Sequence, residues 1–115
     1  PSENHKVHER YSSGRIIVDF GSRLVTVDSK EVGLTKIEWL LLSELAQNAG
    51  RMMLYEELLT RVWGPEYRDD VQLLRTWISR LRHKIESDPS HPTLVRTAPK
   101  IGYIMDGASA NNPPV

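Results

Sequence analysis

The chain has 115 residues, of which 39% are hydrophobic and 26% are charged, and it contains no Cys. This length suits one domain that buries roughly two-thirds of its surface on folding. The composition excludes disulfides, sulfur-ligated zinc and thiolate nucleophiles. The sequence has neither an apolar run long enough to cross a membrane nor the pattern of a signal peptide, so we expect a cytoplasmic protein with no membrane partner.

The charged residues balance in number but not in position. Residues 1–71 carry nine Lys or Arg and twelve Asp or Glu, whereas residues 72–115 carry six basic and three acidic side chains. Between Gln72 and Ile85 there are four basic residues and no acid. Screening at physiological salt confines the influence of a charge to about 8 Å, so a polyanion responds to this local excess rather than to the net charge of zero. A run of this kind is more often simply the solvated face of a helix.

Both ends of the chain lack the pattern of a folded segment. Residues 1–7 are polar and unpatterned, which predicts a linker or a remnant of cloning. Residues 107–115 are rich in Gly, Ala, Asn and Pro, which predicts a disordered tail. The folded domain is therefore expected over residues 8–106. Because the chain starts at Pro1 rather than Met, we expect it to be a fragment of a longer protein.

The first part of this domain has the pattern of a small antiparallel meander. Residues 15–20 form a short run rich in β-branched side chains. A Gly-Ser turn and a second apolar run at residues 24–27 follow it. A weaker strand at residues 8–12 and another at residues 31–34 would complete four strands.

Two helices are predicted next. Thr35 and Glu38 have the spacing of a capping box, and Gly50 suits the left-handed conformation that ends a helix. A second helix is predicted from Tyr55 to Trp63 and is stopped by the Gly-Pro pair that follows.

The third predicted helix, over about residues 70–86, is the most informative element. Asp69 or Asp70 would cap it, and its apolar residues advance by three and four positions along one face. These residues are Val71, Leu74, Ile78, Leu81 and Ile85. The other face carries hydrogen-bond donors without a carboxylate, at Gln72, Arg75, Thr76, Ser79, Arg80, Arg82 and His83.

Two short strands close the domain, at residues 94–97 and 102–105, with Lys100 at the tip of the hairpin between them. Strands, three helices and a closing hairpin define an α+β fold. A helix fits the DNA major groove, where Arg and Gln read base edges and hydroxyl groups bind bases or phosphates. The donor face and the hairpin beside it therefore favour binding to double-stranded DNA over the simpler solvated-face interpretation.

With these elements placed, the sequence resembles the carboxy-terminal effector domains of OmpR/PhoB-family response regulators, which are transcription factors of two-component regulatory systems. The resemblance covers residues 8–106. It rests on the order and spacing of Leu34-Thr35-x-x-Glu38-x-x-Leu41-Leu42-x-x-Leu45, Gly50, Leu58-Leu59-x-x-Val62-Trp63-Gly64, Val71, Leu74, Ile78, Arg80-Leu81-Arg82-x-Lys84-Ile85, Thr97 and Gly102-Tyr103. Within the family, three segments look most like KdpE-type regulators: Leu34-Thr35-x-Ile37-Glu38, Val62-Trp63-Gly64-Pro65 and Asp88-Pro89.

The resemblance implies a winged helix-turn-helix with an N-terminal four-stranded antiparallel sheet, three helices and a C-terminal β-hairpin wing. The third helix would enter the major groove and the wing would lie on the adjacent groove or backbone. DNA-contacting positions of the family fall on Gln72, Arg75, Thr76, Trp77, Ser79, Arg80, Arg82 and Thr97. His83 on the donor face, Lys100 at the hairpin tip and Tyr103 in the hairpin complete the predicted DNA-binding set. Arg80 matches a base-reading arginine and is the strongest single candidate.

The resemblance also implies partners. The loop between the second and third helices would contact RNA polymerase through Pro65, Glu66, Tyr67 and Arg68. A phosphorylatable receiver domain would precede this unit, and a dimer would form on DNA. Two positions depart from the family pattern. Pro99 stands where a minor-groove arginine is common, and Leu54 stands where Ser or Thr usually caps the second helix, which costs that helix about 1 kcal/mol.

Other interpretations of the same residues remain open. Trp39 and Trp63 are expected in the core or partly in it, whereas packing and phosphate contact are equally compatible with Trp77. Tyr103 is expected to pack in the hairpin, with a hydroxyl that could still reach a phosphate. A rival hypothesis makes the domain a protein-interaction module that uses the loop over residues 64–69, or Leu73 and Trp77.

The sequence predicts no catalytic residue, cofactor or metal site. It contains neither a nucleophile elbow nor a glycine-rich phosphate loop. His5 and His8 have no third ligand nearby. Enzymatic activity is therefore not expected.

Overall fold

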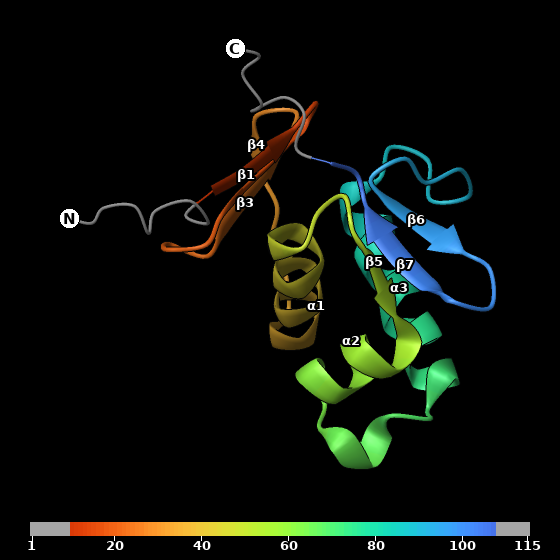
Figure 1. Ribbon diagram of the computed structural model, residues 1–115. Helices are drawn as coiled ribbons and strands as arrows, with labels where there is room; N and C mark the ends of the chain where they lie inside the picture. The colour runs from red at the N-terminus through yellow and green to blue at the C-terminus, as the bar shows by residue number, and fades with distance from the viewer. Residues whose placement is uncertain (1–9, 108–115) are drawn as a thin grey trace.

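The computed structural model describes residues 10–107, in which two antiparallel sheets lie on opposite sides of a group of three helices (Figure 1). The predicted linker at residues 1–7, the first two residues of the predicted first strand and all but Gly107 of the predicted tail lie outside the described residues. The two sheets and the helices match the predicted α+β class.

The N-terminal sheet is the predicted four-stranded meander. Its strands, in the order β1-β2-β3-β4, are β1 (Arg10–Ser13), β2 (Ile16–Asp19), β3 (Leu24–Val27) and β4 (Lys30–Glu31). Ile16 and Val18 alternate inward along β2 and are fully buried. The fourth strand is shorter than the predicted run of residues 31–34 and begins one residue earlier. The reason is that Asp28 and Ser29 both adopt positive φ, of 54° and 68°, and reverse the chain in a tight turn that pairs Lys30 with Val27.

Three α-helices and one 3-10 turn follow, at α1 (Lys36–Gln47), α2 (Tyr55–Val62), η2 (Pro65–Tyr67) and α3 (Val71–Ile85). The predicted capping box of α1 is confirmed. The Thr35 hydroxyl accepts from the Glu38 N–H at 3.4 Å, and the Glu38 carboxylate accepts from the Thr35 N–H at 2.9 Å. Asp70 caps α3 by accepting from the Leu73 N–H at 3.2 Å.

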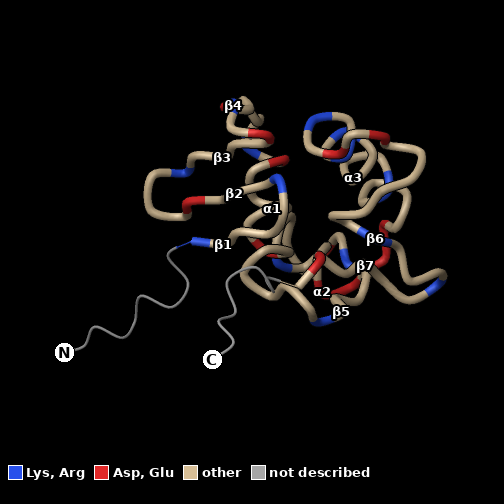
Figure 2. Tube along the Cα trace, turned by 90° about the horizontal axis from the view of Figure 1, so that it is seen from above, with Lys and Arg blue, Asp and Glu red and all other residues tan. Residues whose placement is uncertain are grey.

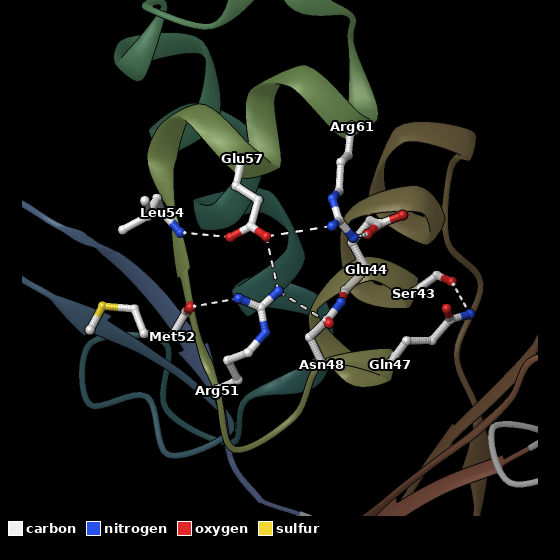
Figure 3. Close-up of polar contacts among 9 residues, drawn as sticks. All are labelled: Ser43, Glu44, Gln47, Asn48, Arg51, Met52, Leu54, Glu57 and Arg61. Atoms are coloured by element: carbon white, nitrogen blue, oxygen red, sulfur yellow. Dashed lines mark hydrogen bonds and ion pairs between the residues drawn. The ribbon is translucent and has the colours of Figure 1, made fainter.

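The N-cap residue of α2 is Leu54, whose side chain cannot accept a hydrogen bond, and Glu57 compensates for the missing cap (Figure 3). The Glu57 carboxylate accepts from the Leu54 N–H at 3.3 Å. The same carboxylate pairs with Arg51 at 2.9 Å and Arg61 at 3.5 Å, and Arg61 reaches Glu44 on α1 at 3.1 Å. The hydrogen bond from Arg51 and the two neighbouring guanidinium charges lower the pKa of Glu57 despite its partial burial. The hydrogen bond from the Leu54 N–H to Glu57 and the ion pairs of Glu57 therefore offset the weak start that the sequence predicts for α2.

The second sheet contains the predicted hairpin and one strand that the sequence did not predict. Its order is β5-β7-β6, formed by β5 (Met52–Leu54), β7 (Gly102–Met105) and β6 (Val95–Ala98). The three residues of β5 are too few to show a period, and only pairing with the distant β7 holds them extended. The wing hairpin, β6 and β7, is thus part of a three-stranded sheet, in which β7 is central and β6 is an edge strand.

The N-terminal sheet is joined to the wing and to α3 by specific polar contacts. The Tyr11 hydroxyl donates to the Asp106 carbonyl, and the Ser13 hydroxyl donates to the Asp106 carboxylate, each at 2.6 Å. Burial raises the pKa of Tyr11 to about 12, and the Asp106 charge adds to the rise against the opposing Ser13 hydrogen bond. Arg15 donates to the Ile85 carbonyl at the end of α3, at 3.2 Å.

Within residues 10–107, every helix is too short or too polar to span a bilayer.

Candidate nucleic-acid interface

The α3 helix has the two faces that its sequence predicts. Leu74, Ile78, Leu81 and Ile85 are at most 1% exposed and belong to the core, while Val71 is half-buried. Six of the predicted contact residues on this helix are exposed, at Gln72, Arg75, Thr76, Ser79, Arg80 and His83. The structure therefore gathers on one solvated surface the donors that the sequence placed on one face.

Arg80 is exposed and its guanidinium lies over the Trp77 ring, with 4.9 Å between the guanidinium carbon and the ring centroid. Trp77 is half-buried and packs against the core. The sequence left open whether Trp77 packs against the core or contacts a phosphate. In the structure, its contacts are with the core and with Arg80. Stacking on a flat, fixed ring limits the rotamers of Arg80 and holds its planar donor fork away from the core.

One hydroxyl and one imidazole of the donor face are oriented by the helix itself. The Thr76 hydroxyl donates to the Gln72 carbonyl at 3.1 Å, so its methyl group and an oxygen lone pair remain for a base edge. His83 Nδ1 lies 2.9 Å from the Ser79 carbonyl oxygen, a contact that requires the proton on Nδ1. In the neutral imidazole, Nε2 is then left as an acceptor.

Of the predicted contact residues, Tyr103 packs in the hairpin as expected, while Arg82 lies closer to the core than the sequence suggests. Tyr103 is 4% exposed and its ring meets Tyr55 edge-on, with centroids 5.8 Å apart. Burial raises the pKa of the Tyr103 phenol, against the opposing charge of Arg82. Arg82 is half-buried and directs two nitrogens at the wing backbone. Both side chains connect α3 to the wing.

The wing tip holds Lys100 in an unusual backbone conformation. The Ile101 N–H donates to the Ala98 carbonyl at 3.0 Å, which closes a four-residue turn with Pro99 second and Lys100 third. Lys100 has φ 67°, a value that favours Gly at this position of the turn. Its side chain is exposed, and Figure 2 shows a basic residue marking the end of the hairpin. Thr97 is also exposed, on the strand that leads to this tip.

Lys84 lies on α3 but is withdrawn from the donor face by an ion pair. Its ammonium lies 2.8 Å from the Glu38 carboxylate, whose side chain is only 4% exposed, and also donates to the Gly33 carbonyl at 3.3 Å. Burial alone would raise the pKa of Glu38, but the hydrogen bonds from Lys84 and Thr35 and the Lys84 charge together hold the pKa below its ordinary value. The pair thus joins α3 to the start of α1.

This ion pair predicts a loss of stability in acid. A carboxyl with a lowered folded-state pKa stabilises the fold above its unfolded pKa of about 4.3, and that stabilisation disappears as pH falls through the folded value. The free energy of unfolding should therefore decline below about pH 5 more steeply in the wild type than in Glu38→Gln, which has no titrating group there. Urea unfolding at a series of pH values measures the slope of stability against pH for both proteins. Equal slopes would show that ionised Glu38 does not contribute to the pH dependence of stability.

The loop between α2 and α3 exposes all four of its predicted contact residues, Pro65, Glu66, Tyr67 and Arg68. Tyr67 is 42% exposed, which is high for an aromatic side chain. The loop is ordered by η2, in which the Tyr67 N–H donates to the Gly64 carbonyl at 3.0 Å.

One residue that positions the interface was not found from the sequence. Glu86, directly after α3, is 7% exposed and its carboxylate accepts from three consecutive backbone N–H groups, at 2.8 to 3.1 Å. These belong to Thr93, Leu94 and Val95 at the start of the wing. An acid after a helix carries no signal of a partner seven to nine residues later. Within the described part of the chain, no group of three or more His, Asp or Glu side chains could hold a metal ion, and His5 and His8 lie outside it.

A helix-turn-helix formed by α2 and α3, followed by a hairpin that packs beside α3, defines the winged helix-turn-helix class. A family model described as "Transcriptional regulatory protein, C terminal" matches residues 29–105. KdpE of Mycobacterium tuberculosis is 43% identical over 86 residues, which cover 75% of this chain and 38% of that protein. KdpE of Escherichia coli is 39% identical over 88 residues, covering 76% of this chain and 39% of that protein. The chain thus spans about two-fifths of the length of these relatives.

Solved structures agree with the sequence relatives. The DNA-binding domain of Klebsiella pneumoniae RstA, solved in complex with the RstA box, superposes with a TM-score of 0.78 at 29% identity, over 86% of this chain and 98% of that domain. The OmpR/PhoB homologue DrrB of Thermotoga maritima superposes with a TM-score of 0.71 at 32% identity, over 86% of this chain and 45% of that protein. The chain therefore belongs to the family of C-terminal domains of transcriptional regulatory proteins, in the OmpR/PhoB group of response regulators.

Proposed function

We propose that this domain, the DNA-binding effector unit of a two-component response regulator, binds with α3 in the major groove and the wing on the adjacent groove or backbone. The observation that carries the proposal is the exposed face of α3, which presents Arg, Gln, Thr and Ser without a carboxylate. An acid on this face would repel phosphates, whereas Arg75, Arg80, Gln72 and Ser79 can donate to a base edge or a phosphate, and Thr76 offers a methyl group and an acceptor oxygen to a base edge.

The proposed roles follow from the contacts of each side chain. Arg80, held on Trp77, is assigned to a base edge, with Gln72 and Thr76 beside it on the same face. Arg75 and Ser79 lie on the same exposed surface and are assigned to bases or phosphates, and the Nε2 acceptor of neutral His83 is assigned to a base-edge donor. Lys100 at the wing tip is assigned to a phosphate in place of the arginine that Pro99 replaces. The activity is binding in the cytoplasm and needs neither a cofactor nor catalysis.

Replacing Arg80 with alanine is the direct test. Selection from a random duplex library should first recover a preferred sequence for the wild-type chain. Arg80→Ala should then bind that duplex about 1–3 kcal/mol more weakly and should lose preference at one base position. Fluorescence anisotropy measures the affinities, and repeating the selection with the variant identifies the position.

Lys30→Ala is the matched control, because it removes the same charge from β4 in the N-terminal sheet. Wild-type binding should fall with added salt, by a slope of about −0.9 for each phosphate neutralised. Salt-independent binding, or an Arg80→Ala variant with wild-type affinity and preference, would contradict the proposed mode.

A second surface is proposed for a protein partner. The loop residues Pro65, Glu66, Tyr67 and Arg68 are all exposed, and the exposed aromatic ring of Tyr67 favours a contact with RNA polymerase. We also assign to the whole protein a receiver domain before this unit and a dimer on DNA. Amide chemical shifts on adding the selected duplex should change over residues 72–84; changes confined to residues 64–69 would favour the interaction-module hypothesis instead.

A further inference from the structure

Arg82 faces the wing rather than the solvent, although it shares the sequence pattern of the exposed donor face. Its Nε and one terminal nitrogen, Nη2, both donate to the Val95 carbonyl, at 3.0 and 2.7 Å. The same Nη2 donates to the Thr97 hydroxyl oxygen at 2.8 Å. Its guanidinium carbon lies 5.5 Å from the centroid of the Tyr103 ring. Three of the five guanidinium donors are therefore directed into the wing.

These contacts fix the start of the wing against α3. Val95 is the first residue of β6, and its N–H is held by Glu86 at 2.8 Å while its carbonyl is held by Arg82. Both side chains come from the C-terminal end of α3, one helical turn apart. Because both polar groups of one wing residue are held from one helix, β6 and the end of α3 have a single relative orientation.

The Arg82 contact also determines what Thr97 presents to solvent. A hydroxyl has one proton to donate, and its oxygen here already accepts from Arg82. The Thr97 side chain is exposed, and its proton donates to no other group within residues 10–107. A hydroxyl whose oxygen accepts from a cation is a stronger donor, and the proton points away from the guanidinium.

We propose that Arg82 is a positioning residue for DNA binding: it holds the wing against α3 and orients the Thr97 hydroxyl as a donor to a backbone phosphate. The inference rests on the proposed function, and it departs from the family-based expectation that Arg82 itself contacts phosphate. Arg82 then contributes to DNA affinity through its hydrogen bonds to the wing and to Thr97. A positive charge at this position without those hydrogen bonds would not maintain the affinity.

Four variants test this inference with two probes, the duplex recovered by selection and an unselected duplex of the same length. Thr97→Val removes the hydroxyl and keeps the side-chain shape, and it should weaken binding to both probes about fivefold. Arg82→Lys keeps the charge but lacks the planar fork that reaches two acceptors, so it should weaken binding at least as much. Arg82→Gln should match Arg82→Lys within twofold. The double variant Arg82→Lys with Thr97→Val should be no more than twofold weaker than Arg82→Lys, because the hydroxyl is already misoriented.

Arg96→Lys is the matched control, since it makes the same change on β6 at a residue paired with Asp106 at 3.6 Å. It should bind like the wild type. Circular dichroism and thermal unfolding identify the folded fraction of each variant, and all affinities refer to that fraction.

Two outcomes would overturn the inference. A direct phosphate contact would give Arg82→Lys near-wild-type affinity, while Arg82→Gln would lose affinity and about 0.9 of the salt slope. Single effects that multiply in the double variant, so that Thr97→Val keeps its full effect in the Arg82→Lys background, would show that Arg82 does not act through Thr97. If instead the wild type binds neither duplex, the proposed function fails, and that result is distinct from both.

Discussion

Glu86→Ala should lower the free energy of unfolding by about 3–5 kcal/mol, because it removes one of the groups that anchor the start of the wing to the end of α3. The Glu86 carboxylate satisfies three consecutive N–H groups, of which those of Leu94 and Val95 are buried. Alanine leaves these donors without an acceptor, and each buried donor left unsatisfied costs roughly 1–3 kcal/mol. Chemical denaturation monitored by circular dichroism measures the loss.

Two further variants give this prediction its control. Glu86→Gln keeps one acceptor oxygen but turns an amide NH2 toward the same backbone donors, so its loss should be about half that of alanine. Glu66→Ala removes an exposed acid from the loop before α3 and should change stability by no more than about 0.5 kcal/mol. A loss below about 1 kcal/mol for Glu86→Ala would show that water replaces the carboxylate and that the wing does not depend on it.

Gly102→Ala should cost about 3 kcal/mol by separating two strands of the wing sheet. A methyl group at Gly102 would overlap the Met53 carbonyl oxygen and lie 2.8 Å from its carbon, in the strand paired with β7. These atoms are backbone, so relief requires β5 to move away from β7. Because Leu54 pairs with Gly102 and is the N-cap residue of α2, the displacement reaches the helix-turn-helix.

The control for Gly102 is another glycine in open space. A methyl group at Gly33 would have no neighbouring atom within 4 Å, and Gly33 does not adopt positive φ, so Gly33→Ala should be neutral or stabilising by up to about 1 kcal/mol. Thermal unfolding of both variants gives the comparison. If Gly102→Ala melts with the wild type, the close approach of β5 and β7 is not a constraint on this fold.

These predictions converge on the way in which the wing is held. Glu86 and Arg82 reach it from the end of α3, and β5 supports it from the start of α2. The proposed DNA-binding surface is therefore a helix and a sheet held in one orientation. Changes at its supports should lower DNA affinity even though they remove no group assigned to a DNA contact.

Local signals in the sequence were sufficient to predict most of the elements. The capping box at Thr35 and Glu38, the apolar period of α3 and the hairpin at the C-terminal end all depend on residues within a few positions of one another. The donor face of α3 followed from the same period, since residues opposite the buried stripe of a helix must face solvent. Arg80 was placed on the exposed face in this way.

The sequence could not predict what depends on partners distant along the chain. The β5 strand exists because β7, about fifty residues later, pairs with it, and the carboxylate of Glu86 gains its role from N–H groups seven to nine residues away. Arg82 and Arg80 lie two positions apart with the same chemistry, yet one turns to the wing and the other to solvent. Helical period alone gives the direction of a side chain, whereas the tertiary structure decides whether another segment of the protein is there to receive it.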